Sequence, residues 1–225
     1  MARRSMREEI VGAGLRRFHE LGYNAAGVKD ITDEAGVPKG SFYNHFESKE
    51  ALAVEALERY GAGLRLTDLA DGSVAPLARI RGHFEFMRDR IVALEGRQGC
   101  LLGNLGAEVA DHSEVIRSAV AGGWRSWVAL LSAAIAQAQA AGEVGPTDPE
   151  ATARFLINAW EGTLLEVRVT ASVEAFEPFF ALAFGRLLAP EPRRPRGARC
   201  GSRPAAPAAP PTAAPRRRSA PSPAG

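Results

Sequence analysis

The amino-acid sequence predicts an all-α protein. Apolar residues recur with a period of roughly 3.6 residues almost everywhere up to residue 188. The alternating, β-branched runs between hairpin turns that indicate strands are missing from the sequence. The chain has 225 residues, 46% of them hydrophobic, which is enough for a small domain attached to a larger one. We therefore expect about nine helices, grouped in an N-terminal domain and a C-terminal bundle.

The first helix is expected to begin at Ser5, because a serine followed three residues later by Glu8 forms a capping-box pattern. Gly22 is expected to end it. Its apolar face holds Ile10, Val11, Leu15, Phe18 and Leu21.

Two short helices are expected next, over about 28–35 and over 39–46. Gly36 closes the first of them, and Pro38 can open the second because proline costs little at a helix entrance. Ser48 is a suitable cap for a longer fourth helix over 48–66, and a loop is expected over 68–76. Breaks rich in Gly, Asp, Ser and Pro then separate five further helices, expected at about 77–95, 100–111, 113–141, 148–171 and 173–188.

The composition changes sharply after Leu188. Ten of the fifteen prolines lie in 189–225, together with eight arginines against a single acid, Glu191. Such a segment cannot bury enough apolar surface to fold, so we expect a disordered tail. Its arginines would either add nonspecific DNA affinity or have no function. The remaining body holds 20 basic and 25 acidic residues, so a DNA-binding face must come from the spatial sorting of charge.

Several classes of protein are not expected. Cys100 and Cys200 lie in regions of different composition, and no Cys/His cluster has metal-ligand spacing, so neither a disulfide framework nor a metal is predicted. No apolar run approaches the roughly 20 uncharged residues of a membrane span. We expect a cytoplasmic protein without a membrane association or a cofactor. No defensible catalytic grouping occurs in 77–188, so an enzyme is not expected.

The helices over 28–35 and 39–46, joined by Gly36-Val37-Pro38, form a helix-turn-helix that can place its second helix in a DNA major groove. Ile31, Val37, Phe42 and Phe46 would form the small core beneath. The exposed positions of the second helix would then be Lys39, Gly40, Ser41, Tyr43, Asn44 and His45, which are mostly hydrogen-bond donors.

Residues 6–52 resemble the DNA-binding signature of the TetR family, above all in Gly22-Tyr23 and in the continuous run from Val37 to Leu52. The resemblance implies a homodimer that binds double-stranded operator DNA and a C-terminal domain that binds a small-molecule effector. It implies that Lys39, Gly40, Ser41 and Asn44 face base edges, that Tyr43, His45 and Lys49 hold phosphates, and that Lys29 touches the operator. One departure is Ala26-Gly27, where family members usually have a Thr or Ser cap.

Other interpretations stay open for these residues. Tyr43 would otherwise be a core residue and His45 a half-buried structural histidine. Lys29, Lys39 and Lys49 would be ordinary solvated lysines in an arbitrary helical protein.

Two apolar stripes resemble the dimer-forming helices of the TetR fold. The alternative is that both stripes belong to the core of a single chain. The predicted interface residues are Leu156, Trp160, Thr163 and Val167 in the first stripe and Phe176, Phe180, Phe184 and Leu187 in the second.

Residues 99–111 resemble a narrower branch of TetR regulators, in which a cysteine opens a helix and reacts with electrophiles or oxidants. In the first turn of a helix the dipole would lower the pKa of the Cys100 thiol, and the resemblance brings Arg168 close to it. The alternatives are a small, buried, inert cysteine and a non-covalent ligand. Core or ligand-pocket roles are open for Phe84, Met87, Leu101, Leu105, Trp124, Trp127 and Trp160.

The expected organisation is a DNA-binding domain over 1–50, a ligand-binding and dimerisation domain over 51–188, and the tail over 189–225. The expected function is repression from an inverted-repeat operator, relieved when the effector shifts the helix after Cys100 against the helix over 48–66. The alternative is a nonspecific or architectural DNA-binding protein.

Overall fold

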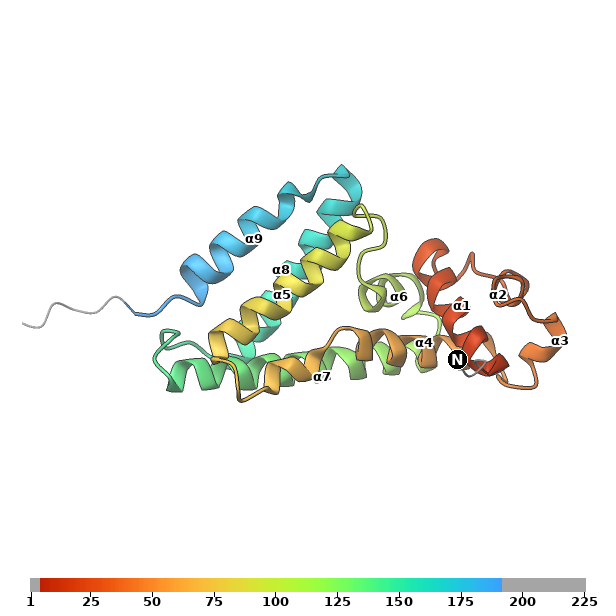
Figure 1. The fold of residues 1–225 in the computed structure, drawn as a ribbon, viewed down its shortest axis with the longest axis horizontal. Coiled ribbons are helices and arrows are strands. Elements are labelled where there is room, and N and C mark those ends of the chain that lie inside the picture. Colours follow the sequence, from red (N-terminus) through yellow and green to blue (C-terminus); the bar gives the residue numbers. More distant parts are fainter. Residues whose placement is uncertain (1–4, 192–225) are drawn as a thin grey trace, which may run out of the picture. The chain divides into compact units, whose positions relative to one another are not determined.

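The computed structural model describes residues 5–191, in which nine α-helices and no strand occur (Figure 1). The prediction of an all-α fold is therefore confirmed. All but the first three residues of the predicted tail, Cys200 among them, lie outside the described residues.

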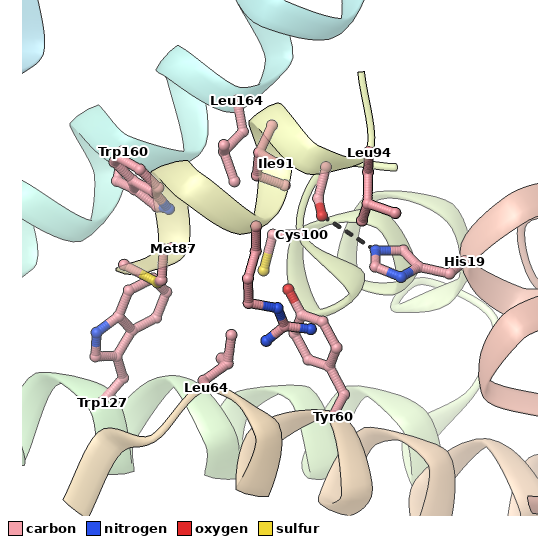
Figure 2. Close-up of a pocket in the computed structure, with 12 residues that line it drawn as sticks. His19, Tyr60, Leu64, Met87, Ile91, Leu94, Cys100, Trp127, Trp160 and Leu164 are labelled. Atoms are coloured by element: carbon pink, nitrogen blue, oxygen red, sulfur yellow. Dashed lines mark hydrogen bonds between the residues drawn. The ribbon is translucent and has the colours of Figure 1, made fainter. Parts of the chain in front are cut away.

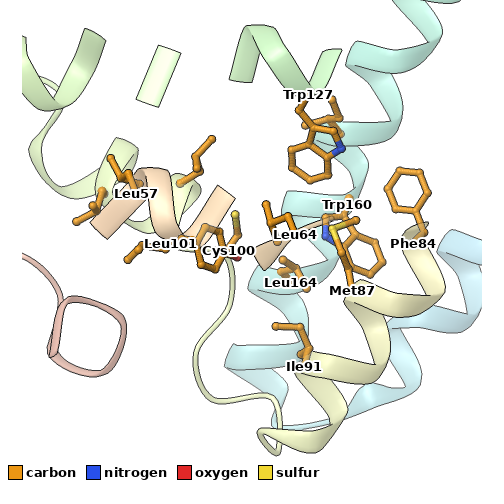
Figure 3. Packing of buried hydrophobic residues seen from close by; sticks show 14 of the residues in the cluster. Leu57, Leu64, Phe84, Met87, Ile91, Cys100, Leu101, Trp127, Trp160 and Leu164 are labelled. Carbon is orange, nitrogen blue, oxygen red and sulfur yellow. The ribbon is translucent and has the colours of Figure 1, made fainter. Parts of the chain in front are cut away.

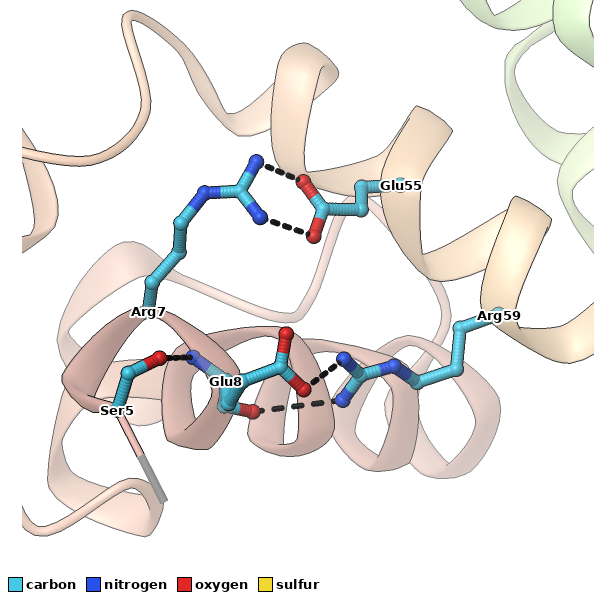
Figure 4. A network of polar contacts seen from close by, with 5 residues as sticks. All are labelled: Ser5, Arg7, Glu8, Glu55 and Arg59. Carbon is cyan, nitrogen blue, oxygen red and sulfur yellow. Dashed lines mark hydrogen bonds and ion pairs between the residues drawn. The ribbon is translucent and has the colours of Figure 1, made fainter.

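Helix α1 (Met6–Leu21) begins and ends where the sequence predicts. The Ser5 hydroxyl accepts the Glu8 N–H at 3.2 Å, and Gly22 ends the helix with a φ of +80°. The Glu8 carboxylate does not complete the capping box, because it pairs with Arg59 of helix α4 (Lys49–Gly63) instead (Figure 4). Arg7 makes a second ion pair with Glu55 of α4. These ion pairs thus hold α1 against α4 in addition to the apolar packing between the two helices.

Helices α2 (Val28–Glu34) and α3 (Lys39–Phe42) form the predicted helix-turn-helix, with Gly36 at a φ of +66° in the turn. The third helix is shorter than the predicted 39–46. After Phe42 the amides of Asn44 and His45 bond to carbonyls three residues back, which tightens the helix end into turns.

The next helices lie close to their predicted positions. The Ser48 hydroxyl caps α4 by accepting the Ala51 N–H at 3.1 Å, a contact worth about 1 kcal/mol. A short 3₁₀ helix, η1 (Leu66–Ala70), occupies part of the predicted loop. Helix α5 (Pro76–Ala93) follows, and then α6 (Leu101–Val109), which has Cys100 as its N-cap.

Two long helices, α7 (Glu114–Ala140) and α8 (Pro149–Thr170), and the short α9 (Phe176–Leu182) complete the bundle. Helix α9 lies between a 3₁₀ helix, η2 (Val173–Ala175), and a π-helical segment, η3 (Ala183–Leu187). Helix α7 packs against α4, α5, α6 and α8. By length and composition alone it is also the one described helix that would suit a membrane, which the sequence analysis did not expect. The same composition suits a helix that packs against several others in a bundle, as α7 does.

An aromatic cluster fills the core between α5, α8 and α9. Figure 3 shows two of its members, Phe84 of α5 and Trp160 of α8, near each other. The ring of Trp160 stacks on Phe176 at 5.3 Å and lies 5.4 Å from Phe84. Trp160 is only 1% exposed within the single chain. Five of the eight predicted interface residues are buried in the same way, namely Leu156, Trp160, Val167, Phe176 and Phe184.

For those five residues the prediction of a dimer interface is wrong, because the single chain already covers them. Thr163, Phe180 and Leu187 are half-buried. Helix α8 carries a second stripe, offset from the first by one or two residues, and periodicity alone does not distinguish the two. We call this second stripe the seam. Its residues are exposed and lie three and four positions apart: Phe155, Asn158, Gly162, Leu165 and Val169.

Candidate DNA-binding face and effector cavity

Helix α3 presents a polar face to solvent. Tyr43 is 61% exposed, so core packing is excluded for it. Phe42 and Phe46, by contrast, are buried against Ile31, as predicted. The predicted reading residues other than Ser41, which is half-buried, are all exposed: Lys39, Gly40, Tyr43, Asn44 and His45. The helix-turn-helix therefore keeps a row of hydrogen-bond donors free on one side.

Lys29 and Lys49 have different surroundings. Lys29 is exposed and pairs with Asp33 one turn further along α2. Lys49 is half-buried, with its ammonium 4.1 Å from the centre of the Tyr23 ring. It donates hydrogen bonds to the carbonyls of Tyr23 (2.9 Å) and Ala26 (3.3 Å). Lys49 thus secures the turn between α1 and α2, and its contact with a phosphate stays a prediction.

Gly27 stands where a capping hydroxyl is usual. Its backbone is extended, and its N–H donates to the Asp30 carboxylate at 3.0 Å. Helix α2 therefore starts without a side-chain cap, so the departure noted in the sequence leaves no hydroxyl here for a phosphate.

Glu108, in the last turn of α6, connects the C-terminal bundle to the helix-turn-helix. Its carboxylate accepts the backbone N–H groups of Tyr23 (2.8 Å) and Asn24 (2.7 Å). Gly22 makes room for this contact, since a Cβ there would lie 2.7 Å from a Glu108 oxygen. Sequence reasoning missed this role, because no local pattern indicates which distant amides an acid will cap.

Two further polar contacts join the same regions. The His19 side chain of α1 lies 3.1 Å from the Gly99 carbonyl through its Nε2, and burial lowers its pKa. Just beyond α6, the Ser113 hydroxyl donates to the Glu50 carboxylate of α4. Both ends of α6 are thereby attached to α1 and α4, the helices on either side of the helix-turn-helix in the chain.

The space among Cys100, Tyr60, Met87, Trp127 and Trp160 is nearly filled (Figure 2). Its volume is about 20 Å³, which is room for one water molecule. Four of the predicted ligand residues, Met87, Cys100, Trp127 and Trp160, line this space, but a small-molecule effector does not fit in it in this state.

A larger cavity of about 470 Å³ opens between α6, α7 and α8. Small-molecule sites typically span about 300–1,000 Å³, so this one is large enough for an effector. Of the predicted ligand residues, Cys100, Trp124 and Arg168 line it. Phe84, Leu101 and Leu105 line neither cavity, since all three are fully buried in the core.

The Cys100 thiol is 5% exposed, and its acidity is the reverse of the prediction. Burial, together with the nearby Glu161 carboxylate, raises its pKa to about 12. A hydrogen bond from the Gly103 N–H lowers the pKa but does not offset these effects. The expected depression by the helix dipole is therefore wrong, because desolvation of a thiolate outweighs it here. At neutral pH Cys100 is a thiol.

Glu161 faces Cys100 from α8, and burial raises its pKa to about 6. Its Oε1 is buried and has no hydrogen-bond partner among the described residues. Gly103 leaves space for this carboxylate, since a Cβ at that position would collide with it. The Tyr60 hydroxyl lies on the other side of the thiol, and burial raises its pKa as well. Arg168 stays exposed, with Nη1 3.4 Å from Asn104 Oδ1.

Known proteins resemble this chain over most of its length. Residues 10–56 match the model of the bacterial regulatory proteins of the tetR family, and residues 76–182 match the tetracyclin repressor-like C-terminal domain. The HTH-type transcriptional repressor DhaR of Mycobacterium sp. strain GP1 is 37% identical over 192 residues, covering 84% of this chain and 95% of DhaR. The transcriptional regulator AcuR of Cereibacter sphaeroides is 37% identical over 184 residues, covering 80% and 83%.

The crystal structure of the reduced form of NemR from Escherichia coli has the same fold. The TM-score is 0.73 at 31% sequence identity, and the match covers 83% of this chain and 100% of NemR. Together with the helix-turn-helix and the helical bundle described above, these matches show that the chain belongs to the TetR family of bacterial transcriptional regulators.

Proposed function

We propose that this protein is a one-component transcriptional repressor that binds an inverted-repeat operator as a dimer in the cytoplasm and is released by a small-molecule effector. The observation that carries the proposal is the contact of Glu108 with the amides of Tyr23 and Asn24. Through it, the helix that lines the effector cavity also caps the turn that positions the DNA-binding helices. A ligand that displaces α6 would thereby change the spacing of the two α3 helices in the dimer.

The dimer would form through the seam on α8 and the neighbouring surface of α9. Four of the five seam residues are apolar or glycine, and Leu165 and Val169 are 63% and 76% exposed. On α9, Leu182 is also 63% exposed. A spacing of three and four residues suits packing against a second helix. The partner would also cover the larger cavity, because Gly162 and Leu165 belong to both the seam and the cavity wall.

The operator experiment measures the affinity of the full chain for a duplex with the inverted repeat upstream of its own gene and for a shuffled duplex. Fluorescence anisotropy at about 50 mM and about 200 mM salt separates the salt-dependent, nonspecific part of the affinity from the sequence-specific part. A repressor is expected to prefer the operator at least about 1,000-fold. Equal affinities with a steep salt dependence would instead indicate a nonspecific or architectural DNA-binding protein.

A second, narrower function is covalent sensing of electrophiles at Cys100. It is supported by the position of the thiol beside the cavity, where the thiol proton would pass to water. The sulfur would then add to an activated carbon–carbon double bond, forming the S–C bond, while the neighbouring carbon takes up a proton. The similarity to NemR, which was solved in a reduced form, also favours a reactive cysteine.

N-ethylmaleimide tests this second function. It is expected to release the wild-type protein from the operator and to leave Cys100→Ser bound. Release of both proteins would remove Cys100 from the mechanism without affecting the repressor proposal.

A further inference from the structure

A separate cavity of about 300 Å³ lies between η1 and the first half of α5. It shares no lining residue with the two cavities around Cys100. Two of its walls are the side chains of Arg79 and His83, which are 6% and 4% exposed. Nothing in the proposed function uses either residue, although burying such groups is costly unless they are hydrogen-bonded.

Arg79 is only partly satisfied. Its Nη2 donates to the side-chain oxygen of Gln137 on α7. Its Nε and Nη1 are buried without a hydrogen-bond partner among the described residues. A guanidinium stays charged at all physiological pH values, so these donors require an acceptor.

His83 adds a third donor. The Trp127 indole N–H lies 3.0 Å from His83 Nε2, and because an indole nitrogen only donates, Nε2 must accept. In a neutral imidazole the proton then resides on Nδ1, which is buried and has no partner in the described part of the chain. Burial lowers the pKa of His83 to about 4, which keeps the ring neutral at physiological pH.

The charged groups around the cavity limit what it can hold. Arg65 pairs with Asp68 at the rim, and the Asp71 carboxylate accepts hydrogen bonds from Ser73. The negative charges of Asp68 and Asp71 formally equal the positive charges of Arg65 and Arg79. A ligand with one negative charge is therefore favoured over a polyanion, and the volume restricts it to a small molecule.

We propose that this cavity binds a small organic monocarboxylate, and that Arg79 and His83, which line it, turn their unpartnered nitrogens toward the ligand oxygens when it binds. It is a second ligand site, beyond the effector cavity of the proposed function. Trp127 links the two regions, because its N–H binds His83 while its ring borders the space beside Cys100.

Calorimetric titration of the full chain with benzoate and with benzamide tests the site without operator DNA. The two probes have similar shapes, and only benzoate carries the negative charge. Saturable binding of benzoate at millimolar concentration or below, with benzamide at least about tenfold weaker, is expected. Equal binding of the two probes, or no saturable binding of benzoate, would overturn the proposal.

Two variants locate the binding. Arg79→Gln is expected to weaken benzoate binding at least about tenfold. Gly82→Leu fills the cavity without removing a donor, since a Cβ at Gly82 meets nothing within 4 Å, and it is expected to abolish binding. If Arg79→Gln does not fold, Gly82→Leu decides alone. Unchanged benzoate affinity in the folded variants would place the ligand elsewhere and contradict the proposal.

Discussion

Helices α3 and α6 are both short, and both carry the residues on which the proposed function depends, but they differ in exposure. Around α3, donors such as Lys39 and Tyr43 stand in solvent over an apolar base. Around the start of α6, Cys100, Tyr60 and Glu161 are largely removed from water, and their pKa values shift accordingly. Exposed polar groups stay hydrated until DNA binds, so they cost little free energy of folding. Buried polar groups contribute to stability as well as to function, so substitutions of them affect both.

The largest effect is expected at the exposed face. Tyr43→Ala and Lys39→Ala should each weaken operator binding by about 2–6 kcal/mol per dimer, since each subunit loses a contact worth about 1–3 kcal/mol. The free energy of unfolding should change by less than about 0.5 kcal/mol. Anisotropy titrations and urea unfolding measure the two quantities, with the exposed Arg154→Ala as the control. Operator affinity equal to that of the control would place the reading face elsewhere.

Substitutions in the two stripes of α8 should have different effects, one on stability and the other on dimerisation. Trp160→Ala is expected to lower the free energy of unfolding by about 3–5 kcal/mol, because it opens a cavity in the aromatic core. Leu165→Asp on the exposed seam should instead yield monomers with an unchanged circular dichroism spectrum. Light scattering and urea unfolding distinguish these results. A dimer that survives Leu165→Asp would show that the seam is not the interface.

Buried His83 should make stability depend on pH. Its pKa is about 4 in the folded protein and about 6.5 when unfolded, so only the unfolded chain binds a proton between these values. Stability is therefore expected to fall as the pH drops from about 6.5 to about 4, by at most about 3 kcal/mol.

His83→Gln keeps an acceptor for Trp127 and should reduce this loss, as measured by urea unfolding across the pH range. Glu161 acts in the opposite direction, because its raised pKa of about 6 stabilises the fold as the pH falls through that value. Both proteins contain Glu161, so its contribution cancels in the comparison. Identical pH profiles would rule out a neutral, buried His83.

Removing the contact between α6 and the DNA-binding region should have a smaller effect. Glu108→Ala leaves two amides without their acceptor and is expected to cost about 1–3 kcal/mol. Hydrogen exchange should become faster at Tyr23 and Asn24, while the exposed Glu177→Ala leaves it unchanged. Unaltered protection of these amides would show that Glu108 does not hold the turn.

The smallest effect is expected next to the thiol. Glu161→Gln removes a negative charge that raises the Cys100 pKa, so Cys100 should be alkylated faster by iodoacetamide at a given pH. The gain is limited because burial, the larger cause, persists. Mass spectrometry of the Cys100 peptide measures the rate. Slower alkylation of the variant would show that Glu161 acts mainly as a base for the thiol.

Much of the architecture follows from local sequence alone. The helical periodicity, the caps at Ser5 and Ser48, and the turn at Gly36 determine where most helices begin and end, because these signals involve neighbours in the chain. The exposed face of α3 was predictable for the same reason. Once Phe42 and Phe46 point inward, the residues between them must largely point outward.

Tertiary structure alone decided which stripe of α8 is buried, what caps the turn after Gly22, and whether Cys100 is acidic. Trp160 and Leu165 are both apolar and lie on stripes with equivalent spacing, so periodicity does not distinguish core from surface. Glu108 acts on amides more than eighty residues away. The Cys100 pKa depends on water exclusion and on Glu161, which comes from another helix. Burial and long-range contacts are properties of the assembled fold, whereas helix boundaries are properties of the local chain.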